Sequence, residues 1–147
     1  MTKTLSLGKI LHIREREKQD AQKAYHYSQE RFEDHAMQLY TLLRKKEAAE
    51  ASYETCLHTT TPINQIKEQL AYIEQLAVQI MQMQHAVQDA RDEMELNQQS
   101  LTDAHVEVKK FEKIMELRQE QRNEVKRKEE KQTMDDISIQ QYLRKNG

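Results

Sequence analysis

The chain has 147 residues, of which 2 are Gly, 1 is Pro, 1 is Cys and none is Trp, whereas 33% are Asp, Glu, Lys or Arg. Because Gly and Pro build most tight turns, this composition excludes barrels, multi-stranded sheets and Rossmann-type folds. Hydrophobic residues make up 37%, while a globular domain usually has about 45–50%. The composition therefore predicts long helices with a narrow apolar seam.

The formal net charge is −2, so the chain has no basic excess for binding nucleic acid. Cys56 has no partner in the sequence for an intramolecular disulfide, which is typical of a reducing compartment. The first residues lack the apolar run of a secretory signal, and no stretch approaches the roughly 18 apolar residues of a membrane span. We therefore expect a cytoplasmic protein that inserts nothing into lipid.

Two halves of the sequence carry a heptad repeat. In the first half the seam begins at Leu7 and returns in steps of four and three residues as far as Cys56, mostly on apolar side chains. In the second half the a positions run from Ile66 to Met115 and the d positions from Gln69 to Val125, with a more regular apolar pattern. This pattern is typical of a coiled coil with a left-handed supercoil.

A short break separates the halves. Three consecutive Thr residues disfavour helix, and Pro62 suits the first position of a helix that Thr61 caps. We therefore predict helix one over 1–58, a turn at 59–62 and helix two over 62–133, followed by a tail, 134–147, with a short helix capped by Asp135 or Asp136. A short connection makes the helices antiparallel neighbours. One continuous kinked helix that pairs with another chain stays open as an alternative.

The expected fold is thus all-α: a long antiparallel two-helix coiled-coil hairpin with a C-terminal helical overhang. If the turn is centred near residue 60, residue i faces about residue 120 − i, and helix two has no intramolecular partner beyond about residue 118. From Lys109 to Lys131 the overhang is rich in charges of both signs. It is either a solvated single helix or a polar shaft that enters a ring or docks along a surface.

The sequence shows no recognisable catalytic or metal-binding pattern. No two His residues lie three or four apart, Cys56 and His58 do not share a helix face, and His35 falls on the seam as a tolerated polar group. No phosphate-binding glycine loop is present, and the adjacent Asp135 and Asp136 do not form an acid/base pair. We expect a protein that is not an enzyme and needs no cofactor or metal.

Three segments nevertheless resemble a known family. They are Leu5-Ser-Leu-Gly-Lys-Ile-Leu-His-Ile-Arg-Glu15, Val106-Glu-Val-Lys-Lys-Phe-Glu-Lys113 and Met134-Asp-Asp-Ile-Ser-Ile-Gln-Gln-Tyr142. Together with the length and the two-helix layout of the whole chain, these segments resemble the FliJ family of flagellar export proteins, in its Gram-positive form.

The resemblance implies a soluble component of the flagellar type III export apparatus, with a coiled coil similar to the stalk of rotary ATPases. The family engages the pore of the hexameric export ATPase with its terminal-side end, contacts the cytoplasmic domain of the membrane export gate, and escorts export chaperones. The chain is then a non-enzymatic stalk located in the cytoplasm, peripheral to the cell membrane at the flagellar base.

The resemblance also implies contact residues. The gate-contacting patch of the family is matched here by Gln38, Leu42, Tyr72 and Leu76. The relationship that residue i faces about residue 120 − i, hereafter the facing rule, independently places Leu42 near Leu76. Neighbouring positions depart from the aromatic, small or His residues expected there, namely Lys45, Ala49, Gln79 and Met83. For the ATPase ring we expect contacts from the overhang, about 110–133, and from the basic side chains Lys109, Lys110, Lys113, Arg118, Arg122 and Lys126.

Two other classes of protein fit the sequence. A purely structural coiled-coil spacer should form stable homodimers and have no affinity for an ATPase. A holdase-like chaperone would bind unfolded clients through Met residues of the seam, such as Met83, Met94 and Met115, although packing is the more common role of such residues.

Overall fold

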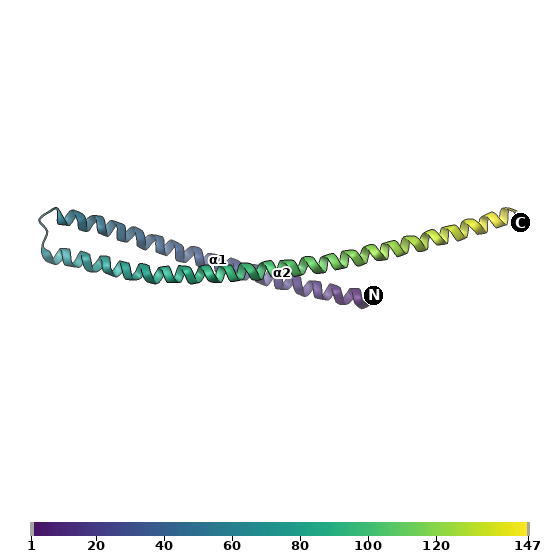
Figure 1. Cartoon of the computed structure of the whole chain (residues 1–147), viewed down its shortest axis with the longest axis horizontal. Helices are drawn as coiled ribbons and strands as arrows, with labels where there is room; N and C mark the ends of the chain where they lie inside the picture. The colour runs from purple at the N-terminus through teal and green to yellow at the C-terminus, as the bar shows by residue number, and fades with distance from the viewer. Residues whose placement is uncertain (1, 147) are drawn as a thin grey trace. The chain divides into compact units, whose positions relative to one another are not determined.

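The computed structural model describes residues 2–146 and contains two long helices, α1 (Thr2–Leu57) and α2 (Ile63–Asn146). The helices pack against each other as a hairpin, and α2 is the longer one (Figure 1). The predicted all-α hairpin is confirmed. The alternative of one continuous helix is wrong, because the helical backbone stops at Leu57 and resumes only at Ile63.

The heptad seam is buried as predicted. Every seam position from Leu7 to Cys56, and every a or d position from Ile66 to Arg118, is buried or half-buried. The most deeply buried apolar side chains are all a or d residues of α2, namely Leu76, Ile80, Ala90 and Val108. Removal of this apolar surface from water supplies the main driving force for pairing the helices.

The connection between the helices closes differently from the prediction. Thr61 does not cap α2: its hydroxyl donates to the carbonyl oxygen of Cys56 at 3.2 Å, at the C-terminal end of α1. The first hydrogen bonds of α2 instead run from the amides of Gln65 and Ile66 to the carbonyl oxygen of Pro62. Pro62 therefore precedes the helix, and its missing amide hydrogen leaves no donor unsatisfied.

None of the described residues has a positive φ angle. The chain therefore reverses direction between Leu57 and Ile63 without the left-handed conformation that usually requires Gly. This geometry explains how a chain with 2 Gly residues makes its one reversal through threonines.

Two compact units are distinguished. The turn unit is Gln19–Thr102, and the terminal unit is Met1–Lys18 with Asp103–Gly147. In the turn unit, α1 and α2 lie side by side, and Asn97 Nδ2 donates to the carbonyl oxygen of Ala24 at 3.2 Å (Figure 1). In the terminal unit, the Arg14 guanidinium lies over the Phe111 ring, 5.8 Å from its centroid.

The register of the turn unit follows the facing rule to within about one helical turn. The rule places Ala24 opposite residue 96, and the observed partner is Asn97. It places Arg31 opposite residue 89, whereas Arg31 pairs with Glu93. The offset is toward the C-terminus of α2 in both cases.

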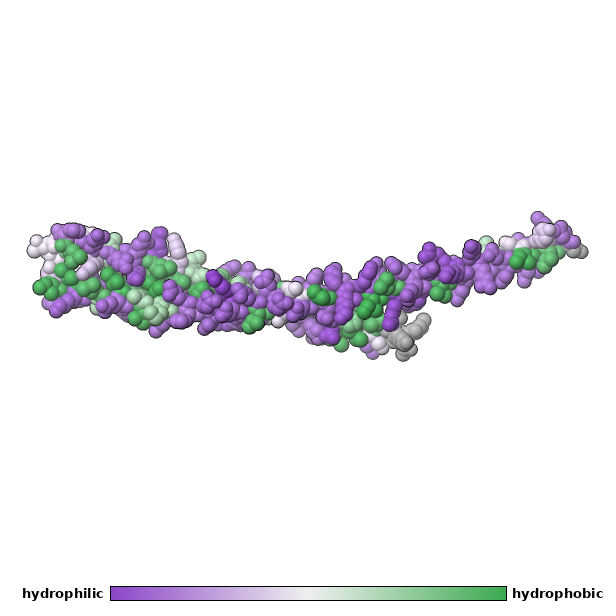
Figure 2. Space-filling view, in the orientation of Figure 1, coloured by the Kyte–Doolittle hydropathy of each residue, from purple (hydrophilic) through white to green (hydrophobic). Residues whose placement is uncertain are grey.

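The C-terminal part of the terminal unit is a helix without a packing partner. All side chains from Gln119 to Asn146 are exposed, which confirms the predicted overhang. On the face seen in Figure 2, hydrophilic side chains cover most of this segment. The helix also continues through 134–146, where the sequence predicted a tail with a separate short helix. No Gly or Pro interrupts this stretch, so Asp135 and Asp136 lie inside α2 and cap nothing.

Candidate partner-binding surfaces

A groove runs along one side of the turn unit, between α1 and α2. Its first part has a volume of about 500 Å³ and is lined by Asp34, Met37, Gln38, Thr41, Leu42, Lys45, Gln79, Gln82 and Met83. Its second part, of about 350 Å³, lies nearer the connection and is lined by Lys45, Ala48, Ala49, Ser52, Gln69 and Tyr72. Because Lys45 borders both parts, we treat them as one feature, the side groove.

The structure brings most of the predicted gate-contact residues to this groove. Gln38 and Leu42 line its first part and Tyr72 its second part. Leu76 is different, because its side chain is 3% exposed and is absent from both linings. Leu42 lines the first part of the groove together with Gln79 and Met83, and the facing rule places Leu42 opposite residue 78.

The four positions that depart from the family pattern also line the side groove, namely Lys45, Ala49, Gln79 and Met83. The groove is therefore built from the same helix faces that the resemblance indicates, with different side chains at these four positions. Apolar contact comes from Leu42 and the two methionines of the lining, while amide and hydroxyl groups form most of the rim. A surface of this kind can bind an apolar segment while it orients that segment through neutral hydrogen bonds.

Reasoning from the sequence missed several lining residues, namely Met37, Thr41, Gln82 and Ser52. None of them lies on a seam position. A heptad pattern marks the buried stripe clearly and its flanks weakly, because flanking positions accept polar and apolar residues alike. The sequence feature that could have identified them is the cluster of small and uncharged residues on the helix face next to the seam.

The predicted ATPase-ring residues fall into two groups in the structure. Arg118, Arg122 and Lys126 lie together along the overhang and line a shallow hollow of about 390 Å³ with Gln121, Val125 and Glu129. Arg118 is the last half-buried seam position, and Arg122 continues the same helix face into the exposed overhang. Beyond Met115 the seam face therefore changes from mostly apolar residues to a mixture, with Arg118 and Arg122 followed by Val125 and Glu129.

The other basic residues are engaged locally or lie apart. Lys109 Nζ is 3.5 Å from Glu112 Oε2, and Lys113 Nζ is 4.0 Å from Glu116 Oε2. Lys110 is exposed and lines no hollow among those described. The structure thus does not gather all six predicted basic residues into one surface.

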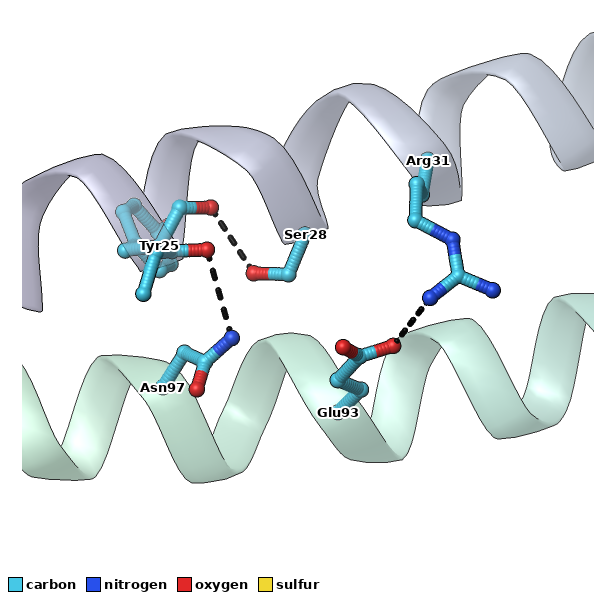
Figure 3. A network of polar contacts seen from close by, with 6 residues as sticks. Tyr25, Ser28, Arg31, Glu93 and Asn97 are labelled. Atoms are coloured by element: carbon cyan, nitrogen blue, oxygen red, sulfur yellow. Dashed lines mark hydrogen bonds and ion pairs between the residues drawn. The ribbon is translucent and has the colours of Figure 1, made fainter.

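A polar layer crosses the middle of the seam in the turn unit. The Ser28 side chain is fully buried and donates to the carbonyl oxygen of Tyr25 at 2.8 Å (Figure 3). Asn97, from the opposite helix, donates to the backbone of α1, and Arg31 pairs with Glu93 nearby. Polar groups in a coiled-coil seam lower stability but favour one register over its alternatives.

The seam also contains other polar residues. Gln69 Nε2 donates to Cys56 Sγ at 3.3 Å, while Gln69 Oε1 and His35 Nδ1 are buried without a hydrogen-bond partner.

Across residues 2–146, no group of three or more His, Cys, Asp or Glu side chains is placed to hold a metal ion. Within the same range, neither helix is long and apolar enough to cross a membrane.

Comparison with known proteins shows the family of the chain. The sequence model of the family described as "Flagellar FliJ protein" matches residues 2–147. The chain belongs to the FliJ family. It is 32% identical over 135 residues to the flagellar FliJ protein of Bacillus subtilis (strain 168), an alignment that covers 92% of each chain. No solved structure matches this chain.

Family membership makes the chain a flagellar export component and confirms the resemblance found in the sequence. The two-helix hairpin with the longer second helix extends over nearly all of the matched residues. The candidate contact surfaces of this FliJ-family chain are therefore the side groove in the turn unit and the basic face of the overhang in the terminal unit.

Proposed function

We propose that this chain is a non-enzymatic stalk that couples the hexameric flagellar export ATPase to the membrane export gate, and that it escorts export chaperones. It acts in the cytoplasm, at the face of the cell membrane where the flagellum is built. The overhang enters the ATPase ring, and the side groove contacts the cytoplasmic domain of the gate. Two surfaces in two units suit a protein that must hold two partners at once.

The observation that carries this proposal is the unpaired helix from Gln119 to Asn146. At about 1.5 Å per residue the segment is roughly 40 Å long, and a helix in water gains little stability without packing. A partner that surrounds the helix, such as the pore of a ring, would supply the missing contacts. Its mixed charges suit a contact that can be released and formed again.

The ATPase contact is tested with a truncation after Arg118. We expect the truncated chain to lose binding to the ATPase and its stimulation of ATP hydrolysis, while it keeps the seam residues packed between α1 and α2. Pull-down and a steady-state ATPase assay measure the two effects. Full binding and full stimulation by the truncated chain would remove the overhang from the proposal.

A charge test refines the assignment. The triple variant Arg118→Gln/Arg122→Gln/Lys126→Gln removes three positive charges from the face that lines the hollow. The control, Arg127→Gln/Lys128→Gln/Lys131→Gln, removes the same number from residues outside that lining. We expect the first variant to weaken ATPase binding more than the control. Equal losses would mean that only net charge matters.

The gate contact is tested with the exposed lining residues, because loss of buried Leu76 would disturb folding. Gln38→Ala combined with Tyr72→Ala should reduce pull-down of the cytoplasmic gate domain, since both side chains are exposed at the groove. Tyr40→Ala, at an exposed position outside the lining, is the control. Unchanged gate binding by the double variant, with helicity preserved in circular dichroism, would contradict the gate assignment.

A further inference from the structure

We propose that the hairpin has a second register, in which α2 lies one heptad nearer the N-terminus of α1 than in the observed structure, and that a shift between the two registers changes the length of the overhang. One heptad is the smallest displacement that keeps both seams in contact. The observations that carry the proposal are a buried acceptor without a partner and exposed apolar side chains on both helices, which the same displacement would pair.

The unpartnered acceptor is Gln69 Oε1, on the seam of α2. In the observed register Gln69 Nε2 donates to Cys56 Sγ at 3.3 Å, and the buried Oε1 receives no hydrogen bond. A shift of one heptad replaces Cys56 by Ala49 and brings the seam residue Lys46 level with Gln69. The Lys46 ammonium, now 3.7 Å from Glu50 Oε1, can donate to this oxygen, which is costly to leave unpaired.

The exposed apolar side chains are Leu43 on α1 and Leu70 on α2, which are 45% and 40% exposed. Each of them directly follows a d position, so both lie on the same edge of the hairpin. The facing rule places Leu43 opposite Ala77 and Leu70 opposite Glu50, so neither meets a large apolar side chain. After a shift of one heptad Leu43 and Leu70 face each other, and their contact removes apolar surface from water.

Polar contacts in the turn unit favour the observed register. Asn97 Nδ2 donates to the carbonyl oxygen of Ala24 at 3.2 Å, and Arg31 pairs with Glu93 at 2.8 Å. The shift breaks both contacts, because it moves each partner by about 10 Å at 1.5 Å per residue. The observed register is therefore the major state. A partner that binds the shifted register more tightly would increase its population.

The connection is long enough to permit the shift. Residues 58–62 join Leu57 to Ile63, and a fully extended chain of this length spans about 20 Å. The shift requires about 10 Å along the helix axis, while packed helices lie about 8–10 Å apart. The hydroxyl of Thr61 holds the observed connection to the carbonyl oxygen of Cys56. Loss of this contact allows the shift while both helices stay intact.

The shift also lengthens the overhang. Because α2 is one continuous helix, a displacement of its turn-side part along α1 moves the whole helix. In the shifted register α2 leaves α1 one heptad earlier, so the unpaired helix gains about 10 Å. Helix shifts between two packed states are an established way to carry a signal between distant sites. This consequence rests on the proposed function, in which the two ends of the hairpin hold different partners.

The register is tested with a short thiol-specific cross-linker on the full chain. In a Cys56→Ser background, Ala36→Cys is combined with Ala77→Cys, Gln84→Cys or Arg91→Cys. Gln84 faces Ala36 in the observed register and Ala77 faces it in the shifted one, whereas Arg91 is displaced equally far in the opposite direction. We expect the 36/84 pair to react fastest and the 36/77 pair to react roughly tenfold faster than 36/91. Equal rates for 36/77 and 36/91 would overturn the second register.

Substitutions assign the contacts of each register. Lys46→Met removes the donor for Gln69 and should slow the 36/77 reaction roughly threefold, whereas Lys45→Met, at an exposed position beside the seam, should not. Asn97→Leu releases the backbone of Ala24 and should speed the reaction. Circular dichroism checks that all variants are folded. Equal effects of Lys46→Met and Lys45→Met would contradict a shift that pairs Lys46 with Gln69.

The consequence for the partners is tested with the purified cross-linked forms. Because their overhangs differ in length, the 36/77 and 36/84 forms should stimulate the export ATPase to different extents, by roughly twofold or more. Equal stimulation would mean that the register carries no signal to the ATPase. If the unmodified chain does not stimulate the ATPase, the proposed function fails and this consequence fails with it, whereas the cross-linking rates decide the second register independently.

Discussion

Arg31 on α1 donates to Glu93 Oε2 on α2 at 2.8 Å and so joins the two helices of the turn unit (Figure 3). The two side chains are 44% and 43% exposed, so water screens their attraction. The pair lies beside Asn97 and Ser28, in the polar layer of the seam. The short distance between Arg31 and Glu93 therefore indicates the register of the two helices, whereas the pair contributes little to stability.

We expect the coupling between Arg31 and Glu93 to be small. A double-mutant cycle with Arg31→Met and Glu93→Gln should give a coupling free energy of about 0.2–1 kcal/mol, because exposed ion pairs rarely contribute more. Urea denaturation at low salt measures it, and the value should fall in 1 M salt. A coupling well above this range, unaffected by salt, would mean that the pair is shielded from solvent.

Leu76→Ala should destabilise the hairpin strongly. The side chain is 3% exposed, and removal of such a group typically lowers the free energy of unfolding by about 2–5 kcal/mol. Leu70→Ala, at a position that is 40% exposed, serves as the control and should change it by about 0.5 kcal/mol or less. Equal effects in urea denaturation would show that Leu76 does not pack in the seam. Loss of gate binding by Leu76→Ala would therefore not identify a contact residue.

Asn97→Leu should make the hairpin more stable and its register less specific. Asn97 occupies a d position and donates to Ala24, which fixes the two helices relative to each other, while Leu at d gains apolar burial. Spin labels at the exposed positions 30 and 95 measure the register. The unmodified chain should give one narrow distance distribution and the variant a broader one. A narrow, unchanged distribution in Asn97→Leu would assign the register to other residues.

Gly8→Ala should stabilise the N-terminal part of α1. Gly8 lies inside the helix, and a Cβ added there meets no atom within 4 Å. Replacement of a helical Gly by Ala is favourable by about 0.5–1 kcal/mol when no clash follows. Slower hydrogen exchange of the amides in the first turns measures the gain. Lys9→Ala is the matched control and should change protection little, and faster exchange in Gly8→Ala would contradict the expectation.

Much of the seam was predictable from the sequence because a coiled coil is specified by a local repeat. The heptads from Leu7 to Cys56 and from Ile66 to Arg118 are buried in the structure. The overhang was predictable for the same reason, because the second helix is longer than the first and its last residues have no helix to pack against. The sequence predicts a separate short helix capped by Asp135 or Asp136, whereas α2 continues through both residues, because no Gly or Pro interrupts it there.

The side groove was only partly predictable. The resemblance to the family indicated Gln38, Leu42 and Tyr72, which line it, but also Leu76, which is buried beneath the surface. A single helix face shows which residues share a side, but not which residues of the other helix stand opposite them. That depends on the register, which the facing rule gives only to within about one helical turn.

The sequence by itself determined that two long helices form, where they are interrupted and which stripe of each is buried, because these properties depend on local propensity and on a heptad period. Only the tertiary structure decided how the connection closes, with Thr61 bonded to α1 instead of α2, and which side chains from the two helices meet. Both depend on the relative position of residues distant in sequence, which packing and polar contacts such as that between Asn97 and Ala24 establish.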